Sequence, residues 1–206
     1  MNTATQTTLP DSTWRTLIAE LRPAWSLFLV LTVITGFIYP MLITGIAQGI
    51  FPHEANGSLI LRDGKAVGSA LIGQPFSDAK HLWGRPSATA PQPYNGLASG
   101  GSNLGPLNPA LSDAVKARIA DLRAANPTQQ GPVPQDLVTT SASGLDPHIS
   151  TKAAIWQVDR IARARSVPTS QVRTIIDKYT EFPTLGLFGE DSVNVLQVNL
   201  ALDELK

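Results

Sequence analysis

The chain has 206 residues, with 16 basic and 16 acidic side chains, no cysteine, and a composition that is 43% hydrophobic. The balanced charge offers neither a basic field for nucleic acid nor an acidic tail typical of disorder, so we expect no nucleic-acid partner. The absence of cysteine excludes disulfides, a thiol nucleophile and a lipid anchor on cysteine. About 150 residues follow the one long apolar run, which is enough for one globular domain.

That run extends from Ala24 to Phe51 and contains no charged residue and no histidine. At about 1.5 Å per residue, a helix of this length reaches about 42 Å, whereas the hydrocarbon core of a bilayer is about 30 Å thick. The run predicts a transmembrane helix over residues 23–52. We expect a tail and a short helix before it, over residues 1–22, and a soluble domain after it, over residues 53–206.

Two other interpretations of the apolar run are open. A buried core helix would rarely run this long without a charge. A cleaved signal peptide is the main competitor, with Ala47-Gln48-Gly49 as the small-residue cleavage site. Signal peptides have shorter apolar regions, however, and Pro40 interrupts this one.

The residues around the run indicate its direction. Arg15 and Arg22 precede it, and no Lys or Arg follows until Arg62. The positive-inside rule therefore predicts a cytoplasmic N-terminus and an extracytoplasmic domain. Ser12 or Thr13 is the expected N-cap of the short leading helix.

Three residues within the run predict contact with another membrane helix. Gly45 and Gly49 form a small-xxx-small pair that permits close backbone approach, and Pro40 frees a carbonyl one turn back, which predicts a kink. The alternative is a plain anchor with incidental glycines, because Gly and Pro are common in transmembrane helices.

The remainder of the chain predicts a small mixed α/β (α+β) domain. Asp63-Gly64 lies between two short apolar runs and predicts a β-hairpin over 59–72. Asn108-Pro109 is typical of a helix start. The other expected elements are a helical turn over 76–82 capped by Ser77 or Asp78, helices over 109–126, 151–165 (capped by Ser150) and 168–179, and a segment over 193–205 that is strand-like and then helix-like, with the choice left open.

The glycine-rich run over residues 97–105 lies in a long segment without periodicity, and such long loops are often functional. Successive backbone N–H groups in glycine-rich turns can bind anions, so Ser99, Gly100, Gly101 and Ser102 are candidate contacts for a nucleotide phosphate. The run lacks the lysine and the spacing of a P-loop. The competing interpretation is structural: the glycines permit positive φ in a packed loop.

A second unusual run, residues 139–150, combines tight turns with no reactive side chain, which is typical of a recognition or scaffolding loop. Asn and Asp side chains also serve commonly as caps and turns, so each candidate has a structural alternative. The candidate partner contacts in the two loops are Tyr94, Asn95, Asn103 and Asn108 in the first and Asp146 and His148 in the second.

No pattern in the sequence indicates chemistry. His53, His81 and His148 have no metal-ligand spacing, and neither G-x-S-x-G nor H-E-x-x-H occurs. We therefore expect no catalytic residue, no metal and no cofactor bound by this chain alone.

At these loops the sequence closely resembles the KdpC family, the C subunits of the bacterial high-affinity potassium-transporting P-type ATPase, the Kdp complex. The resemblance extends in order from about Arg22 to Leu202. The matching pieces are G-F-I-Y-P at 36–40, G-Q-P-F at 73–76, W-G-R-P-S at 83–87, S-G-G-S-N-L-G-P at 99–106, S-G-L-D-P-H-I-S at 143–150, Ala153-Ala154, Gln157, Arg160 to Ala162, and V-N-V-L at 193–196.

The resemblance implies a non-enzymatic subunit of the bacterial inner membrane. It also implies a complex with a channel-like potassium-translocating subunit, a P-type ATP-hydrolysing subunit and a small peptide subunit. It implies a role in stabilising that assembly and in modulating the outer ion entrance. The alternative is a catalytic chaperone that raises the ATP affinity of the pump subunit by direct nucleotide contact, so that ATP enters through the complex. The neutral domain predicts no acidic surface that would concentrate potassium.

Overall fold

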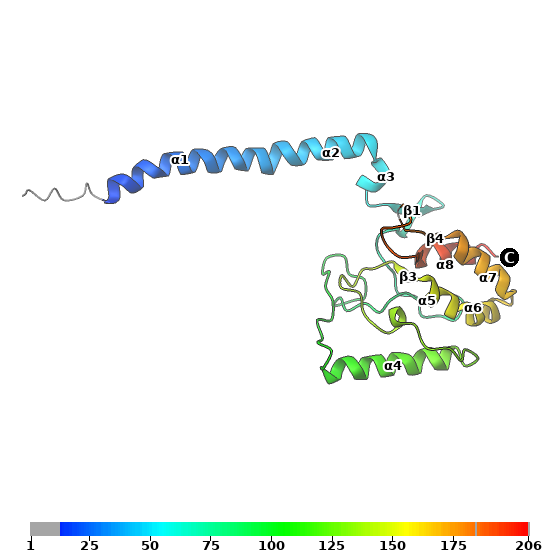
Figure 1. The fold of residues 1–206 in the computed structure, drawn as a ribbon. Helices are drawn as coiled ribbons and strands as arrows, with labels where there is room; N and C mark the ends of the chain where they lie inside the picture. Colours follow the sequence, from blue (N-terminus) through cyan, green and yellow to red (C-terminus); the bar gives the residue numbers. More distant parts are fainter. Residues whose placement is uncertain (1–12, 184, 206) are drawn as a thin grey trace, which may run out of the picture. The chain divides into compact units, whose positions relative to one another are not determined.

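The structure, a computed structural model, describes residues 13–183 and 185–205, and the chain divides into two compact units, residues 1–56 and 57–206 (Figure 1). The first unit consists of α1 (Thr13–Val33), a π-helical turn (Ile34–Ile38), α2 (Tyr39–Ile50) and the short α3 (Pro52–Ala55). The helix is long and apolar enough to cross a membrane over Ile18–Ile50. Ser12, one of the two expected caps, lies outside the described residues.

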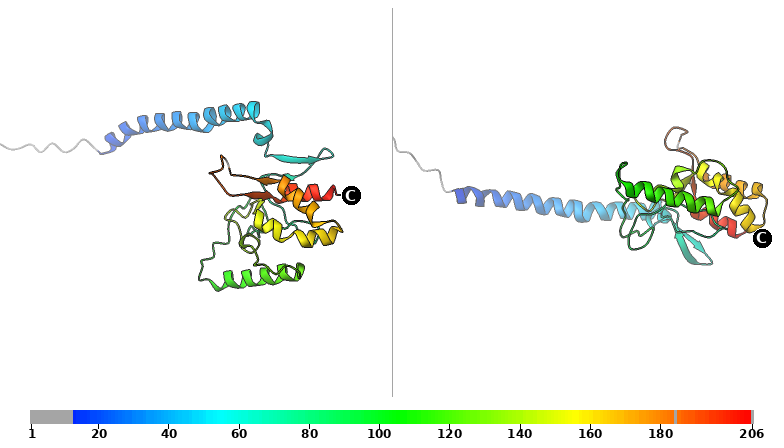
Figure 2. Two further views of the ribbon diagram at one scale, coloured as in Figure 1. Left: turned by 45° about the vertical axis from the view of Figure 1, so that its right-hand side comes forward. Right: turned by 90° about the horizontal axis from the view of Figure 1, so that it is seen from below.

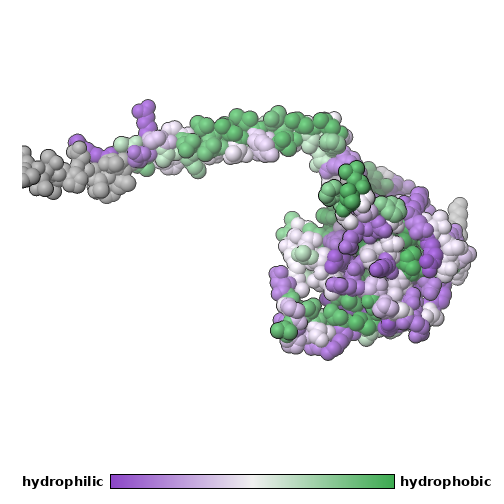
Figure 3. Space-filling view, in the orientation of Figure 1, coloured by the Kyte–Doolittle hydropathy of each residue, from purple (hydrophilic) through white to green (hydrophobic). Residues whose placement is uncertain are grey.

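At Pro40, where the sequence predicts a kink, the structure has a π-helical turn just before the proline. Pro40 is the second residue of α2, directly after the π-helical turn, in which the Tyr39 amide donates to the Ile34 carbonyl five residues back. A π turn inserts one extra residue and so absorbs the missing proline N–H. Figure 1 shows the helix continuing through this point, and Figure 3 shows its apolar surface.

The second unit begins with the predicted hairpin, β1 (Leu59–Arg62) paired antiparallel with β2 (Lys65–Ser69). Asp63 (φ 51°) and Gly64 (φ 73°) are both left-handed, as a type I′ turn requires. The predicted helical turn at 76–82 is wrong, because residues 78–81 form a non-helical turn. There the Asp78 carboxylate accepts from the Lys80 amide at 2.8 Å, and this local bond competes with a helical one.

The core of this unit is a three-stranded antiparallel sheet with helices packed against it (Figure 2). The strand order is β3 (His148–Ser150), β5 (Ser192–Asn194), β4 (Thr180–Glu181), with Ile149 opposite Val193 and Thr180 also opposite Val193. The helices are α5 (Thr151–Trp156), α6 (Val158–Arg165), α7 (Thr169–Lys178) and α8 (Val195–Asp203). An antiparallel sheet with segregated helices is the predicted α+β class.

Buried apolar side chains from every one of these helices meet at the sheet. Ile161, Val172, Ile176, Val198 and Leu202 are all fully buried. Residues 193–205, which the sequence left open, form both elements, since Asn194 ends β5 and accepts from the Gln197 amide as the N-cap of α8.

Two further helical predictions are confirmed in outline. In α4 (Pro109–Ala125) the Asn108 side chain accepts from the Ala110 amide as the N-cap. The predicted helix over 151–165 is capped by Ser150, as expected, but is divided at Gln157 into α5 and α6. The Gln157 side chain bonds to both backbone groups of Trp83, at 2.9 and 3.1 Å, which ties this point of the helix to a neighbouring loop. A 3₁₀ turn (Gln135–Leu137) follows the loop after α4.

Candidate functional site

The two loops singled out in the sequence lie against each other. The Gly100 amide and the Ser99 hydroxyl both donate to the Ser143 carbonyl, at 2.8 and 3.1 Å. The Thr140 and Ser102 hydroxyls are 3.3 Å apart. We call residues 94–108 and 139–150 the paired loops. An anion at the glycine run would have to compete with the Ser143 carbonyl for two of the four candidate nucleotide contacts.

Gly144 and Ser87 hold the paired loops together. The Ser87 hydroxyl donates to the Gly144 carbonyl at 2.7 Å and accepts from the Tyr94 amide at 2.9 Å. Gly144 has φ 67°, and a Cβ there would lie 2.7 Å from the Gly100 carbonyl oxygen. Only glycine satisfies both the left-handed backbone and this close approach. Gly100 and Gly101 do not need positive φ, so the structural interpretation of the glycine run is wrong on that point; Asn103 (φ 51°) is the left-handed residue in it.

Tyr94 belongs to the framework of the first loop. Its hydroxyl donates to the Arg85 carbonyl at 2.5 Å, and its ring occupies the space where a Cβ on Gly73 would stand. Burial and the nearby Asp146 carboxylate raise the pKa of Tyr94 to about 12, against the opposing effect of the Arg85 guanidinium. The tyrosine therefore stays neutral and acts as a hydrogen-bonded brace.

Two of the candidate asparagines are also bound internally. The Asn95 side chain donates to the Ala90 carbonyl and accepts from the Leu97 amide, and Asn108 caps α4. Asn103 is exposed, and so are Leu97 (99%) and Leu107 (96%). These two leucines were not among the predicted partner contacts, although apolar residues in a polar, glycine-rich loop can indicate an interaction surface. They and Asn103 form the solvent-facing side of the first loop.

Asp146 and His148 lie where the second loop enters β3. The Asp146 carboxylate is 3.3 Å from the Arg85 guanidinium and accepts from the His148 amide at 3.0 Å. The His148 ring lies 3.8 Å from both Asp146 and the Glu181 carboxylate. Both candidates therefore belong to one charged cluster.

This cluster borders a surface hollow of about 210 Å³. Its charged lining residues are Arg85, Asp136, Asp146, His148, Glu190 and Asp191. Four carboxylates therefore gather here beside Arg85. They come from distant parts of the chain, and a balanced overall charge does not reveal such clustering. Within residues 13–183 and 185–205, no three His, Asp or Glu side chains are arranged to hold a metal ion.

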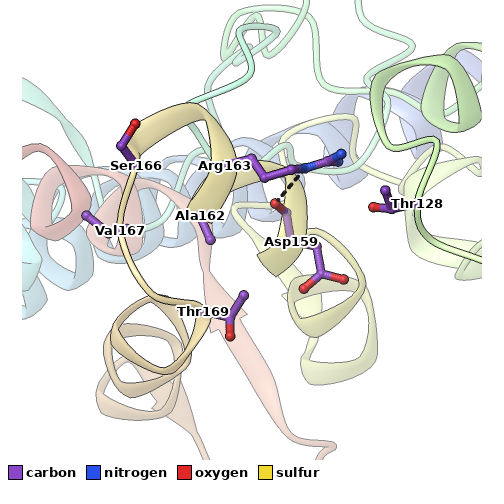
Figure 4. Close-up of a pocket in the computed structure, with 7 residues that line it drawn as sticks. All are labelled: Thr128, Asp159, Ala162, Arg163, Ser166, Val167 and Thr169. Atoms are coloured by element: carbon purple, nitrogen blue, oxygen red, sulfur yellow. Dashed lines mark hydrogen bonds between the residues drawn. The ribbon is translucent and has the colours of Figure 1, made fainter.

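A second hollow, between α6 and the loop after α4, is shown in Figure 4. Arg163 and Asp159 line it, with Thr128, Ser166 and Thr169 nearby. The Arg163 guanidinium donates to the Asp159 carbonyl at 3.2 Å and to the Asn126 side chain at 3.0 Å. These bonds direct it to the protein, and we assign no ligand to this hollow.

The turn over residues 78–83 is held by buried polar side chains. The Arg160 guanidinium donates to the carbonyls of Asp78, Ala79 and His81 and lies over the Trp83 ring at 4.2 Å. Arg160 is only 3% exposed. Burial lowers the pKa of Arg160 to about 10, with Asp78 opposing the shift, so the side chain remains charged at neutral pH.

His81 joins this turn to the last helix. Its ring nitrogens lie 2.6 Å from the Asp78 carboxylate and 2.9 Å from the Asp203 carboxylate, and Arg165 is 2.6 Å from Asp203. Burial alone would raise the pKa of both carboxyls. Hydrogen bonds outweigh it, from His81 to Asp78 and from Arg165 and His81 to Asp203, so the pKa of each lies below its ordinary value. His81 and Asp203 are 122 residues apart in the sequence, so no local pattern predicts this contact.

The helix residues Pro40, Gly45 and Gly49 lie in the first unit. Gly45 and Gly49 are exposed and four residues apart on one side of α2, and no other side chain lies within 4 Å of a Cβ built on either. None of the apolar span is buried within the chain. In the part of the chain that the structure describes, one membrane-length helix is uncovered and is followed by a small α+β domain, an architecture typical of the class of membrane proteins.

Comparisons with known proteins identify the family within this class. The sequence model of the family described as "KdpC: K+-transporting ATPase, c chain" matches residues 21–204. A protein of Polaromonas naphthalenivorans named "Potassium-transporting ATPase KdpC subunit" is 64% identical over 186 residues, 90% of this chain and 95% of that protein. Proteins of the same name from Sorangium cellulosum (60% identical; 91% and 98% covered) and Methylococcus capsulatus (54%; 92% and 100%) are similar along the same length. The chain therefore belongs to the KdpC family, which confirms the resemblance seen in the motifs.

Proposed function

We propose that this chain is a non-catalytic accessory subunit that stabilises the assembly of the channel-like potassium-translocating subunit with the ATP-hydrolysing subunit and the small peptide subunit. The observation that carries the proposal is that its two candidate contact surfaces are exposed and make few contacts within the chain. The apolar helix, with its Gly45 and Gly49 face, is uncovered within the chain. The paired loops use their polar groups to hold each other and leave Leu97, Asn103 and Leu107 exposed. Such surfaces are suited to contact with other proteins rather than to chemistry.

The membrane helix is tested by a matched pair of substitutions. Gly45→Leu fills the space that close backbone approach requires and should reduce co-purification of the other subunits several-fold. Ala47→Leu places the same bulk about 200° around the helix and serves as the control. Equal loss of co-purification in both variants, or no loss in either, would contradict a specific helix contact at Gly45.

We further propose that the domain lies outside the cytoplasm and modulates the outer ion entrance. Arg15 and Arg22 before the helix, with no Lys or Arg after it until Arg62, favour this direction. A reporter enzyme that works only outside the cytoplasm should be active when it is fused after Lys206. If a reporter that works only in the cytoplasm is active at the same position, the domain lies inside and the proposed direction is wrong.

The alternative, a direct ATP contact through Ser99 to Ser102, is separated by proteolysis of the assembled complex. Nucleotide contact predicts that ATP protects residues 99–108 from cleavage. Our proposal predicts cleavage that is the same with and without ATP, because the Gly100 amide and the Ser99 hydroxyl already bond to the Ser143 carbonyl.

A role at the ion entrance is tested on the exposed side of the first loop. In the assembled complex, Asn103→Ala with Leu107→Ser should change the potassium concentration that half-activates ATP hydrolysis. Asn95→Ala on the inner side of the same loop controls for loop disruption. An unchanged potassium response in the complex that still assembles would restrict the role of this surface to assembly.

A further inference from the structure

The connection between β4 and β5 carries an unusual concentration of exposed apolar side chains. Phe182, Leu185, Leu187 and Phe188 are 73%, 84%, 80% and 68% exposed. Single exposed leucines are normal on protein surfaces, but four large apolar residues within seven positions indicate a surface that is covered in use. We call these four residues the apolar tip. It is distinct from the paired loops, and the sequence motifs did not single it out.

The backbone presents this tip rather than leaving it loosely connected. At its base, Thr180 and Glu181 pair with Val193 and Ser192, and Val193 is fully buried in the core. Within the tip, the Gly186 amide donates to the Pro183 carbonyl at 2.9 Å. Both views in Figure 2 show this connection projecting from the body of the domain.

Leu185 supports the same conclusion. It has φ 58°, a left-handed conformation that is unfavourable for a residue with a side chain. The turn that holds Leu185 in this conformation keeps it 84% exposed. A strained and exposed apolar residue does not stabilise the free domain, so we infer that its role is contact with another molecule.

The charges around the tip indicate what covers it. Glu181, Glu190 and Asp191 are exposed at its base, and no Lys, Arg, Trp or Tyr lies between residues 181 and 191. Segments that bind lipid surfaces carry basic residues and interfacial aromatics such as Trp, whereas an acidic collar is repelled by anionic headgroups. We call Glu181, Glu190 and Asp191 the acidic collar. The acidic collar complements a protein surface with basic side chains.

We propose that the apolar tip inserts into an apolar recess, rimmed by Lys or Arg, on the extracytoplasmic face of another subunit of the potassium-transporting complex. This inference rests on the proposed function, because that function places the domain beside those subunits. It adds a third contact to the helix and the paired loops, and it assigns the partner surface a definite chemistry.

The test uses the full chain in membranes that contain the whole complex. Phe188→p-benzoylphenylalanine should form a light-induced cross-link to another subunit of the complex. The matched control is Leu71→p-benzoylphenylalanine, at a leucine of the same domain that is 60% exposed but lies outside the tip. It should cross-link several-fold less.

Every other outcome overturns the proposal. A cross-linked dimer of this chain identifies a second copy as the occupant, an adduct with lipid identifies the membrane, and the absence of any adduct leaves the tip uncovered. If the subunits co-purify normally and position 188 does not cross-link to them, the inference fails while the proposed function stands. If no subunit co-purifies, the proposed function fails.

The collar supplies an independent arm. Glu190→Lys combined with Asp191→Lys should lower the cross-linking yield from position 188 several-fold at low salt and less at high salt, because screening weakens both the attraction and the new repulsion. Asp113→Lys, a charge reversal at an exposed residue of α4, should leave the yield unchanged. An unchanged yield in the double variant would remove the basic rim from the proposal.

Discussion

The turn over residues 78–83 and the first of the paired loops, residues 94–108, are both irregular, yet they are held in opposite ways. Buried side chains bind the backbone of the turn. Gln157, between α5 and α6, pairs with Trp83; Arg160 of α6 binds three carbonyls; and Asn199 of α8 pairs with Leu82. The first loop is bound instead by other irregular segments, namely residues 85–90 and the Ser143 carbonyl of the second loop. The turn therefore belongs to the core, whereas the loop is free to serve a partner.

The largest expected effect is at Arg160. Arg160→Ala removes the buried guanidinium that binds the carbonyls of Asp78, Ala79 and His81, and it should lower the free energy of unfolding by about 3 to 5 kcal/mol. Denaturant unfolding of the full chain in detergent measures it. Arg173→Ala, an exposed arginine on α7, should change stability by less than about 0.5 kcal/mol. Equal losses would contradict the role given to the turn.

A smaller loss is expected at Asn199. Its side chain accepts from the Leu82 amide at 2.7 Å and donates to the Leu82 carbonyl at 2.9 Å, and both residues are almost fully buried. Asn199→Leu leaves both groups unpaired and should lower the free energy of unfolding by about 2 to 4 kcal/mol, measured in the same way. A loss within the error of the Arg173→Ala control would show that the turn does not depend on this pair.

The His81 link predicts a pH dependence. The pKa of Asp203 lies below its ordinary value of 3.8, so its ionised form stabilises the fold above that pH, and the contribution is lost as the pH falls through the lowered pKa. The melting-temperature difference between the parent chain and Asp203→Asn should therefore shrink from about pH 5 to about pH 3. Asp113→Asn on α4, where the ion pair with Lys116 is exposed, should show a constant difference.

The smallest effect on stability is expected in the first loop. Leu97→Ser and Leu107→Ser remove side chains that make almost no contact within the domain, so each should change the free energy of unfolding by less than about 0.5 kcal/mol. Both should reduce the yield of the assembled complex. A large loss of stability would place this loop with the turn and abolish the distinction between them.

Much of the fold was predictable because its signals are local. Asp63-Gly64 predicted the hairpin turn, Asn108 and Ser150 predicted helix caps, and the uncharged run predicted the long helix. One of the two failures has a local cause, because the Asx turn at Asp78 replaced a helical turn. The other does not: the helix divides at Gln157, whose side chain bonds to Trp83, 74 residues away in the sequence.

The candidate site was predictable only in part. The motifs singled out both loops but did not reveal that the loops pair, nor that Tyr94 and Asn95 bond within the domain. The apolar residues of the tip at 182–188 can be read from the sequence, but their exposure cannot. An apolar run beside a strand reads equally well as core until the fold shows what covers it.

By itself the amino-acid sequence determined the membrane-length helix, the α+β class, most helix starts and the family, because each depends on composition, on neighbours a few residues apart or on ordered motifs. Only the tertiary structure decided which polar residues are structural: it buried Arg160, joined His81 to Asp203, and gathered carboxylates around Arg85. The physical reason is distance along the chain. Burial and ion pairing depend on residues that chain folding alone brings together, and no local pattern records those encounters.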